Sequence, residues 1–138
     1  MNSAFPSAGK ILIVEDEFLV ALQLEDIVSD GGYAVVGTVP DRASVLDLEE
    51  VPDVALVDLN LRDGLTGPDI ARHLAGQFGA RVIYVTATPN QIDYPAETAV
   101  GFVQKPFSRQ TILAAIAYAL AGCPEQDRPA ELERLRSH

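Results

Sequence analysis

Five side chains that can do chemistry stand at the ends of short apolar runs. Glu15 and Asp16 end the stretch ILIVED, Asp58 ends VALVD, Thr86 ends VIYVT, and Lys105 follows GFVQ. Carboxylate, hydroxyl and ammonium groups bind divalent cations or take part in group transfer. If each run is a strand of one parallel sheet, all five side chains meet at the same edge of that sheet.

Carboxylates gathered at one edge need positive charge beside them. Two acids about 5 Å apart repel by roughly 3 kcal/mol at an effective dielectric near 20. Lys105 supplies one positive charge, and the remaining negative charge suits a hard divalent cation, Mg²⁺ foremost with Mn²⁺ as an alternative. Asp58, fixed by its apolar run, is the candidate nucleophile that would form an aspartyl phosphate. The cation, Lys105 and the Thr86 hydroxyl would then bind the phosphoryl oxygens.

Each of these residues has an ordinary structural interpretation when taken alone. An Asp after an apolar run is commonly a helix cap or a turn residue. Thr86 suits a strand, and Lys-Pro makes a turn with a solvated lysine. The combination, with each group at the end of a separate strand, indicates a site for phosphoryl transfer. Glu17 is assigned instead to the start of the first helix, where the helix dipole favours an acid.

Short β-branched runs alternate with amphipathic segments along most of the chain. The runs predict strands buried on both faces, over residues 11–14, 33–39, 54–59, 81–86 and 100–103. The amphipathic segments predict helices over residues 17–30, 41–48, 68–78 and 109–121. Residues 88–99 contain two prolines and predict one short helix or broken turns. The alternation predicts an α/β fold with a parallel sheet and right-handed crossovers.

Composition limits the classes of partner. The chain has 138 residues, enough for one domain, and a formal net charge of −10. This charge disfavours direct binding to nucleic acid or to an anionic membrane surface, although solubility alone also explains it. A single cysteine, Cys123, excludes an internal disulfide. No signal peptide or membrane-length apolar run is evident, so we expect a cytoplasmic protein.

With these motifs, the chain resembles the receiver domain of response regulators, the CheY-like domain of bacterial two-component signalling. The resemblance covers about residues 10–121 and is carried by the acids of VEDE, the Asp of VDLNLRDG, the Thr-Ala of VTAT and the Lys-Pro of QKPF. It implies a doubly wound (βα)5 flavodoxin-like three-layer sandwich. The implied five-stranded parallel sheet has the order 2-1-3-4-5, here with an irregular or short fourth helix.

The rest of the chain is predicted to be short extensions of that domain. Residues 1–9 are expected to form a flexible arm, and residues 122–138 a polar tail with a short helix over 130–136. No output domain is recognised, so the chain resembles a stand-alone, single-domain regulator.

The resemblance implies a role for each site residue. Asp58 would accept a phosphoryl group from a sensor histidine kinase or a histidine phosphotransfer protein. Asp16, Asp58 and the backbone carbonyl of Asn60 would bind Mg²⁺, with Glu15 acting directly or through water. Lys105 would contact the phosphoryl group and the Asp58 carboxylate, and in this family the peptide bond to the following proline is usually cis.

The resemblance also implies switch residues, and the spacing of apolar residues on the first helix indicates a candidate docking surface. The family pairs the strand-four threonine, Thr86, with an aromatic residue, here Phe102. Because a phenyl ring has no hydroxyl to satisfy, we expect Phe102 to be largely inward even without phosphate. On the first helix, Phe18, Leu19 and Leu22 point away from the buried face, and they either cover the edge of the fold or dock the kinase's helical hairpin. We expect a monomer or a phosphorylation-dependent dimer.

The leading interpretation is a signalling switch that promotes its own phosphorylation and dephosphorylation and acts on an unidentified protein target, rather than a classical enzyme. A phosphate sink or relay in a kinase network is the alternative. A haloacid-dehalogenase-like hydrolase is disfavoured because it carries an acid two residues after the nucleophile, where this chain has Asn60. A nucleotide- or flavin-binding module is disfavoured because no glycine-rich phosphate loop follows a strand. A receiver that binds partners without phosphate is disfavoured by the complete set of acids, threonine and lysine.

Overall fold

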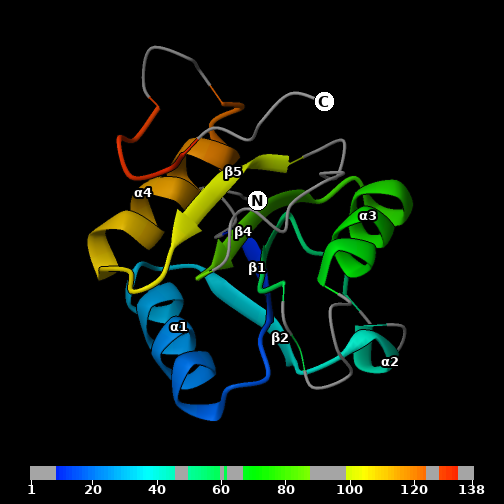
Figure 1. The fold of residues 1–138 in the computed structure, drawn as a ribbon. Helices are drawn as coiled ribbons and strands as arrows, with labels where there is room; N and C mark the ends of the chain where they lie inside the picture. Colours follow the sequence, from blue (N-terminus) through cyan, green and yellow to red (C-terminus); the bar gives the residue numbers. More distant parts are fainter. Residues whose placement is uncertain are drawn as a thin grey trace.

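A parallel sheet forms the centre of the computed structural model, which describes residues 9–45, 50–59, 61, 67–87, 99–123 and 128–133. The elements are, in chain order, β1 (Lys10–Val14), α1 (Phe18–Asp30), β2 (Ala34–Val39), α2 (Arg42–Val45), β3 (Val54–Val57), α3 (Gly67–Phe78), β4 (Arg81–Thr86), β5 (Ala99–Gln104) and α4 (Arg109–Leu120). All strand pairs are parallel, and the strand order is β2-β1-β3-β4-β5. Helices α1 and α4 cover one face of the sheet, and α2 and α3 lie on the other (Figure 1). The predicted doubly wound fold is confirmed.

The central strand β1 is buried on both faces. Ile11 and Ile13 pack into the core cluster shared with α1 and α4, whereas Leu12 and Val14 pack into the cluster shared with α2 and α3. All four side chains are fully buried, as alternation along a strand covered on both faces requires. Polar side chains carried by this strand are therefore confined to its ends.

Several element boundaries differ from the sequence prediction by a few residues. β3 ends at Val57 rather than at residue 59, so Asp58 directly follows the strand. α2 is described over Arg42–Val45, and residues 46–48 of its predicted range lie outside the described residues. The predicted cap of α4 is present, because the Ser108 hydroxyl oxygen accepts a hydrogen bond from the Thr111 amide at 3.1 Å.

Some predictions fall on parts of the chain that the structure does not describe. The short or irregular fourth helix was expected over residues 88–99, of which 88–98 lie outside the described residues. The flexible arm expected over residues 1–9 also lies outside the described residues, apart from Gly9. Among the described helices, none combines the length and the apolar character that crossing a bilayer demands.

The C-terminal segment differs from its prediction. Instead of starting a helix over 130–136, residues 130–133 form a turn that ends in an antiparallel bridge between Glu133 and Phe102 of β5. Leu132 is only 1% exposed and belongs to the core cluster beside α1 and α4. Burial of this one leucine on the sheet outweighs the weak helical preference of a short polar stretch. Residues 134–138 lie outside the described part of the chain.

Candidate functional site

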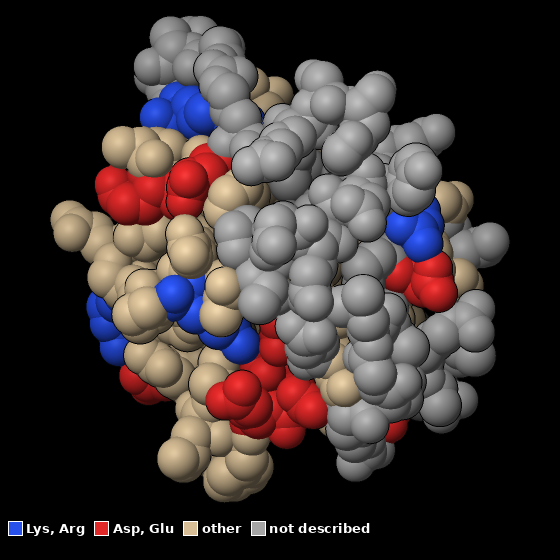
Figure 2. Space-filling view, in the orientation of Figure 1, with Lys and Arg blue, Asp and Glu red and all other residues tan. Residues whose placement is uncertain are grey.

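Acidic side chains gather where β1 and β3 end. Glu15 and Asp16 directly follow β1, and Asp58 directly follows β3. The backbone holds them in place, because the amide of Glu15 donates to the carbonyl of Val39 and the amide of Asp58 donates to the carbonyl of Val14, each at 3.0 Å. Figure 2 shows a patch of acidic side chains at the lower centre of the view, with basic side chains beside it. The predicted meeting of the acids at the carboxyl edge is observed.

The three carboxylates are close enough to share one cation. Glu15, Asp16 and Asp58 each offer a carboxylate oxygen, and these oxygens all lie within 4.8 Å of one another. Two of the residues are nearly inaccessible, Glu15 at 3% and Asp58 at 6% exposure. At such a separation each pair of charges repels by about 3 kcal/mol with an effective dielectric near 20. An all-oxygen donor set of this kind fits a hard divalent cation such as Mg²⁺.

Within the described part of the chain, Lys105 is the basic residue that pairs with this cluster. It directly follows β5, and its ammonium nitrogen Nζ lies 2.9 Å from Glu15 Oε1 and 3.3 Å from Asp58 Oδ2. Its amide donates to the carbonyl of Thr86 at 2.9 Å, and its peptide bond to Pro106 is cis, as the resemblance implied. The sequence prediction paired Lys105 with Asp58, whereas the structure places it between two acids and nearer to Glu15.

Burial and neighbouring charge change the proton affinities of this cluster. The pKa of Glu15 is raised, first by loss of solvent and then by the negative charge of Asp58, against the lowering effect of the Lys105 hydrogen bond. Burial alone would lower the pKa of Lys105, but the hydrogen bond to Glu15 and the charges of both acids outweigh it, so the pKa of Lys105 is raised. The lysine is therefore firmly charged, and negative charge remains in excess around it.

The two predicted switch residues lie on neighbouring strands. Thr86 ends β4, is fully buried and stands opposite Gln104 in the register of β4 with β5. Phe102 stands opposite Tyr84, and its half-buried ring packs against the core cluster on the α2 and α3 side. The inward position of Phe102 stays a prediction, as do the switching roles of both residues.

The remaining predicted site residues divide into one that lies outside the described residues and three that are exposed. Asn60, the implied source of a metal-binding carbonyl, is not among the described residues. Phe18, Leu19 and Leu22 at the start of α1 are 72%, 77% and 44% exposed. A cavity of about 270 Å³ lies between Phe18, Leu22 and the acids Glu15 and Asp16. An apolar surface therefore borders the acidic cluster directly.

Two contacts at the site were not predicted. Gly67, the first residue of α3, donates its amide to the carbonyl of Leu59 at 3.1 Å, and a Cβ atom there would come within 2.1 Å of the carbonyl oxygen of Asp58. The close packing of α3 on the loop after β3 therefore requires glycine at this position. The amide of Glu17 donates to Glu15 Oε2 at 3.1 Å. The Gly-Pro pair that begins α3 is the one sequence signal for the first contact, and backbone donors give no sequence signal for the second.

Comparison with known proteins adds independent support for the fold and the family. The family described as the response regulator receiver domain matches residues 11–117. The phyllosphere-induced regulator PhyR of Methylorubrum extorquens is 33% identical over 117 residues, which cover 82% of this chain and 44% of that protein. The transcriptional regulatory protein PdtaR of Mycobacterium tuberculosis is 29% identical over 119 residues, which cover 81% of this chain and 57% of that protein. The chain thus spans about half the length of these relatives.

Solved structures agree with this result. The receiver domain of the PhyR response regulator from Erythrobacter litoralis superposes with a TM-score of 0.75 at 36% identity, covering 83% of this chain and 92% of that one. PhyR from Brucella abortus superposes with a TM-score of 0.74 at 32% identity, covering 83% of this chain and 49% of that one. The match over most of the chain, the sheet order and the acidic edge lead to one conclusion: the chain belongs to the receiver domain family of response regulators.

Proposed function

We propose that the chain is a phosphoacceptor switch. Asp58 takes a phosphoryl group from a sensor histidine kinase or a histidine phosphotransfer protein in a Mg²⁺-dependent reaction, and the phosphorylated chain signals through contacts with another protein. The observation that carries the proposal is the cluster of Glu15, Asp16 and Asp58 with Lys105 held between two of its members. The family supports the coarser statement, because receiver domains of response regulators are signalling switches.

The donor set of the cluster fits Mg²⁺. Glu15, Asp16 and Asp58 would hold the ion, since they present carboxylate oxygens within 4.8 Å of one another. The backbone carbonyl of Asn60 completes this proposal from the family pattern. When bound, the cation would supply positive charge for the oxygens of the transferring phosphoryl group.

The protein's own groups carry the proposed transfer. A carboxylate oxygen of Asp58 attacks the phosphorus atom, and the bond from phosphorus to the donor's histidine nitrogen breaks, so the imidazole leaves. Lys105 donates from Nζ to a phosphoryl oxygen, and the Thr86 hydroxyl donates to another. Attack by water on the same phosphorus atom breaks its bond to the Asp58 oxygen, which releases inorganic phosphate and restores the carboxylate. In this proposal the chain promotes its own phosphorylation and dephosphorylation, and Thr86 and Phe102 report the change to the surface.

The exposed start of α1 is proposed as the docking surface for the phosphodonor. Phe18, Leu19 and Leu22 expose apolar side chains next to the acids of the site. A phosphohistidine must come within bonding distance of Asp58, so its carrier has to cover neighbouring surface. Leu22→Glu should slow phosphotransfer from the cognate donor while leaving transfer from acetyl phosphate unchanged. Equal slowing of both reactions, or of neither, would remove the docking role.

The downstream partner is proposed to be a protein. PhyR of Bartonella quintana, a solved structure at 31% identity, is described as an anti-anti-sigma factor, which is a role in protein–protein binding. The net charge of −10 also disfavours direct contact with nucleic acid. We further propose that residues 10–121 form the receiver domain, that it acts in the cytoplasm, and that it is a monomer or a phosphorylation-dependent dimer.

Beryllofluoride, an analogue of the phosphoryl group, tests the proposal. Fluorine NMR of the full chain with Mg²⁺ and beryllofluoride should show a bound signal that is absent without Mg²⁺. Asp58→Asn removes the attacking oxygen with little change in shape, and it should abolish the signal. A bound signal that persists in Asp58→Asn, or no signal in the unchanged chain, would refute the proposed site.

A further inference from the structure

Residues 128–133, here called the strap, lie along the outer edge of β5. β5 is the last strand of the sheet, so one side of its backbone is free to pair with another segment. The strap uses that side, because the amide of Phe102 donates to the carbonyl of Glu133 at 3.0 Å and the amide of Glu133 donates back to the carbonyl of Phe102 at 2.9 Å. The strap covers the edge with one antiparallel bridge.

Arg128 anchors the other end of the strap. The pairing of β5 with β4 skips Val100, and the carbonyl of Val100 accepts a hydrogen bond from Arg128 Nη2 at 2.9 Å. The guanidinium also lies 5.5 Å from the centre of the Tyr118 ring and donates from Nη1 to the carbonyl of Leu132. Its Nε is buried and has no hydrogen-bond partner in the described part of the chain. An unpaired buried donor weakens the anchor.

The middle of the strap depends on one buried side chain and one glycine. Leu132 is 1% exposed and enters the core cluster beside α1 and α4. It can do so because Gly101 has no side chain, as a Cβ atom there would lie 2.5 Å from the carbonyl oxygen of Glu133 and 3.2 Å from Leu132. The bare backbone of Gly101 is therefore what lets the strap approach the sheet.

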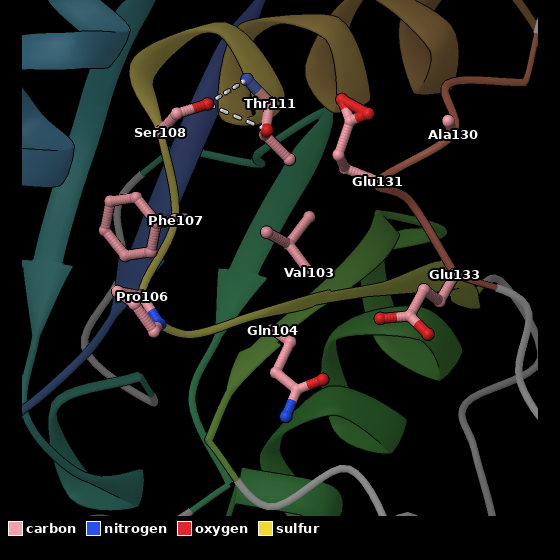
Figure 3. Close-up of a pocket in the computed structure, with 9 residues that line it drawn as sticks. All are labelled: Val103, Gln104, Pro106, Phe107, Ser108, Thr111, Ala130, Glu131 and Glu133. Carbon is pink, nitrogen blue, oxygen red and sulfur yellow. Dashed lines mark hydrogen bonds between the residues drawn. The ribbon is translucent and has the colours of Figure 1, made fainter.

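The strap makes contact on β5 but stands away from the loop that follows it. A cavity of about 400 Å³ separates Ala130, Glu131 and Glu133 from Phe107 and Ser108, as Figure 3 shows. The hydrogen bonds from the strap to the sheet lie at Val100 and Phe102 of β5, and its side chains add the contact of Arg128 with Tyr118 and the burial of Leu132. A short segment attached at the edge of a sheet can leave while the strands stay paired with one another.

The same short length of β5 also connects to the candidate site. Phe102, whose amide and carbonyl both bind Glu133, lies three residues before Lys105, whose Nζ lies between Glu15 and Asp58. The amide of Lys105 donates a hydrogen bond to the carbonyl of Thr86, which joins the end of β5 to the end of β4. A displacement of Lys105 toward a phosphoryl group would shift the end of β5, the strand to which the strap is hydrogen-bonded.

We propose that the strap is a displaceable latch on β5, held in the phosphate-free chain and released when the Asp58 site binds a phosphoryl group. The inference rests on the proposed function, because it names what that function regulates. Release would uncover the edge of β5 and the bare backbone at Gly101, a surface suited to pairing with an extended segment of a partner. Because linkage is reciprocal, the strap must also weaken binding at the Asp58 site.

Hydrogen exchange in the full chain tests the latch. The amide of Phe102 should exchange slowly in the free protein and at least about fivefold faster with Mg²⁺ and beryllofluoride, the lower end of typical coupling between sites. Bound beryllofluoride with unchanged exchange at Phe102 would overturn the latch and leave the proposed function intact. Failure to bind beryllofluoride would refute the proposed function and the latch together.

Two variants test the reciprocal effect from opposite sides of the contact. Leu132→Asp removes the buried anchor from the strap, and Gly101→Ala places a methyl group where the strap must lie. Both should tighten beryllofluoride binding about fivefold or more. Ala130→Asp adds the same charge as Leu132→Asp at an exposed position of the strap and should leave binding unchanged. Binding that is unaltered in both folded variants, or tightened equally by Ala130→Asp, would contradict the latch. The exchange measurement decides the matter if either variant fails to fold.

Discussion

Two clusters in this molecule each join two acids to one base, and they differ in burial. At the carboxyl edge of the sheet, Lys105 lies between Glu15 and Asp58, and the three side chains are 16%, 1% and 7% exposed. On the outer surface, Arg109 of α4 pairs with Asp26 and Asp30 of α1, and these side chains are 45%, 76% and 67% exposed. The charge types are the same, whereas the contact with water is not.

Burial distinguishes the two clusters, because charges removed from water need a partner of opposite charge within the protein or a bound ion. Water around Arg109 screens its ion pairs, so these pairs add little to the stability of the contact between α1 and α4. At the sheet edge, loss of solvent raises the pKa of Glu15, and a third acid, Asp16, shares the space, where Lys105 is the one lysine among the described residues that pairs with these acids. The buried cluster is left with excess negative charge, which a divalent cation is suited to balance.

The largest expected effect is the loss of phosphoryl uptake in Asp58→Asn. The amide keeps the shape of the side chain but lacks the nucleophilic carboxylate oxygen. Incubation with acetyl phosphate and Mg²⁺, followed by intact mass measurement, should show one added phosphoryl group in the unchanged chain and none in the variant. Asp26→Asn, in the exposed cluster, is the control and should be phosphorylated normally. Retained uptake in Asp58→Asn would remove the distinction between the two clusters.

Lys105→Met should slow phosphoryl uptake from acetyl phosphate about 100-fold, since it removes one preorganised donor to the transferring group. The same variant should bind Mg²⁺ more tightly, because the lysine no longer competes for Glu15 and Asp58. Calorimetric titration with Mg²⁺ measures the second effect. Weaker Mg²⁺ binding in Lys105→Met would show that the lysine supports the ion rather than substituting for it.

The pH dependence of stability should also separate the clusters. The pKa of Lys105 is raised above its usual 10.5 in the folded chain. Its stabilising contribution is therefore complete below that pH and is lost as the pH rises through the higher folded value. Urea unfolding without Mg²⁺ should give a higher free energy for the unchanged chain than for Lys105→Met at pH 7, and the difference should shrink above pH 10.5. A constant difference across that range would contradict the raised pKa.

The smallest expected effect is that of Arg109→Gln. Removing an exposed base from its two partners should lower the free energy of unfolding by less than about 1 kcal/mol. Because an arginine stays charged, this difference should not vary between neutral and strongly alkaline pH, in contrast to Lys105→Met. Urea unfolding in low and high salt measures both features. A decrease of several kcal/mol in the free energy of unfolding would contradict the view that the exposed cluster contributes little to stability.

The fold and the acidic edge could be predicted because both follow from short-range patterns. Strands buried on two faces appear as continuous β-branched runs, and the rule for parallel sheets then brings the ends of those runs to one edge. The assumption of one parallel sheet is enough to predict that four residues lie together, namely Glu15, Asp16, Asp58 and Lys105.

The features that escaped prediction depend on contacts between distant residues. The strap contributes one leucine, Leu132, and its partner Phe102 lies far away in the sequence, so no local period marks it. The preference of Lys105 for Glu15 over Asp58 depends on tenths of an ångström at the end of a side chain. The need for glycine at Gly67 arises from the backbone after β3, which passes too close for a side chain.

Identification of the modified residue tests the central claim most directly. The full chain is treated with acetyl phosphate with and without Mg²⁺, and the phosphoryl group is assigned to a residue by peptide mass spectrometry under conditions that preserve acyl phosphates. The expected result is a single phosphoryl group on Asp58 that forms only when Mg²⁺ is present. A phosphoryl group on Asp16 or Glu15, or Mg²⁺-independent labelling of Asp58, would contradict it.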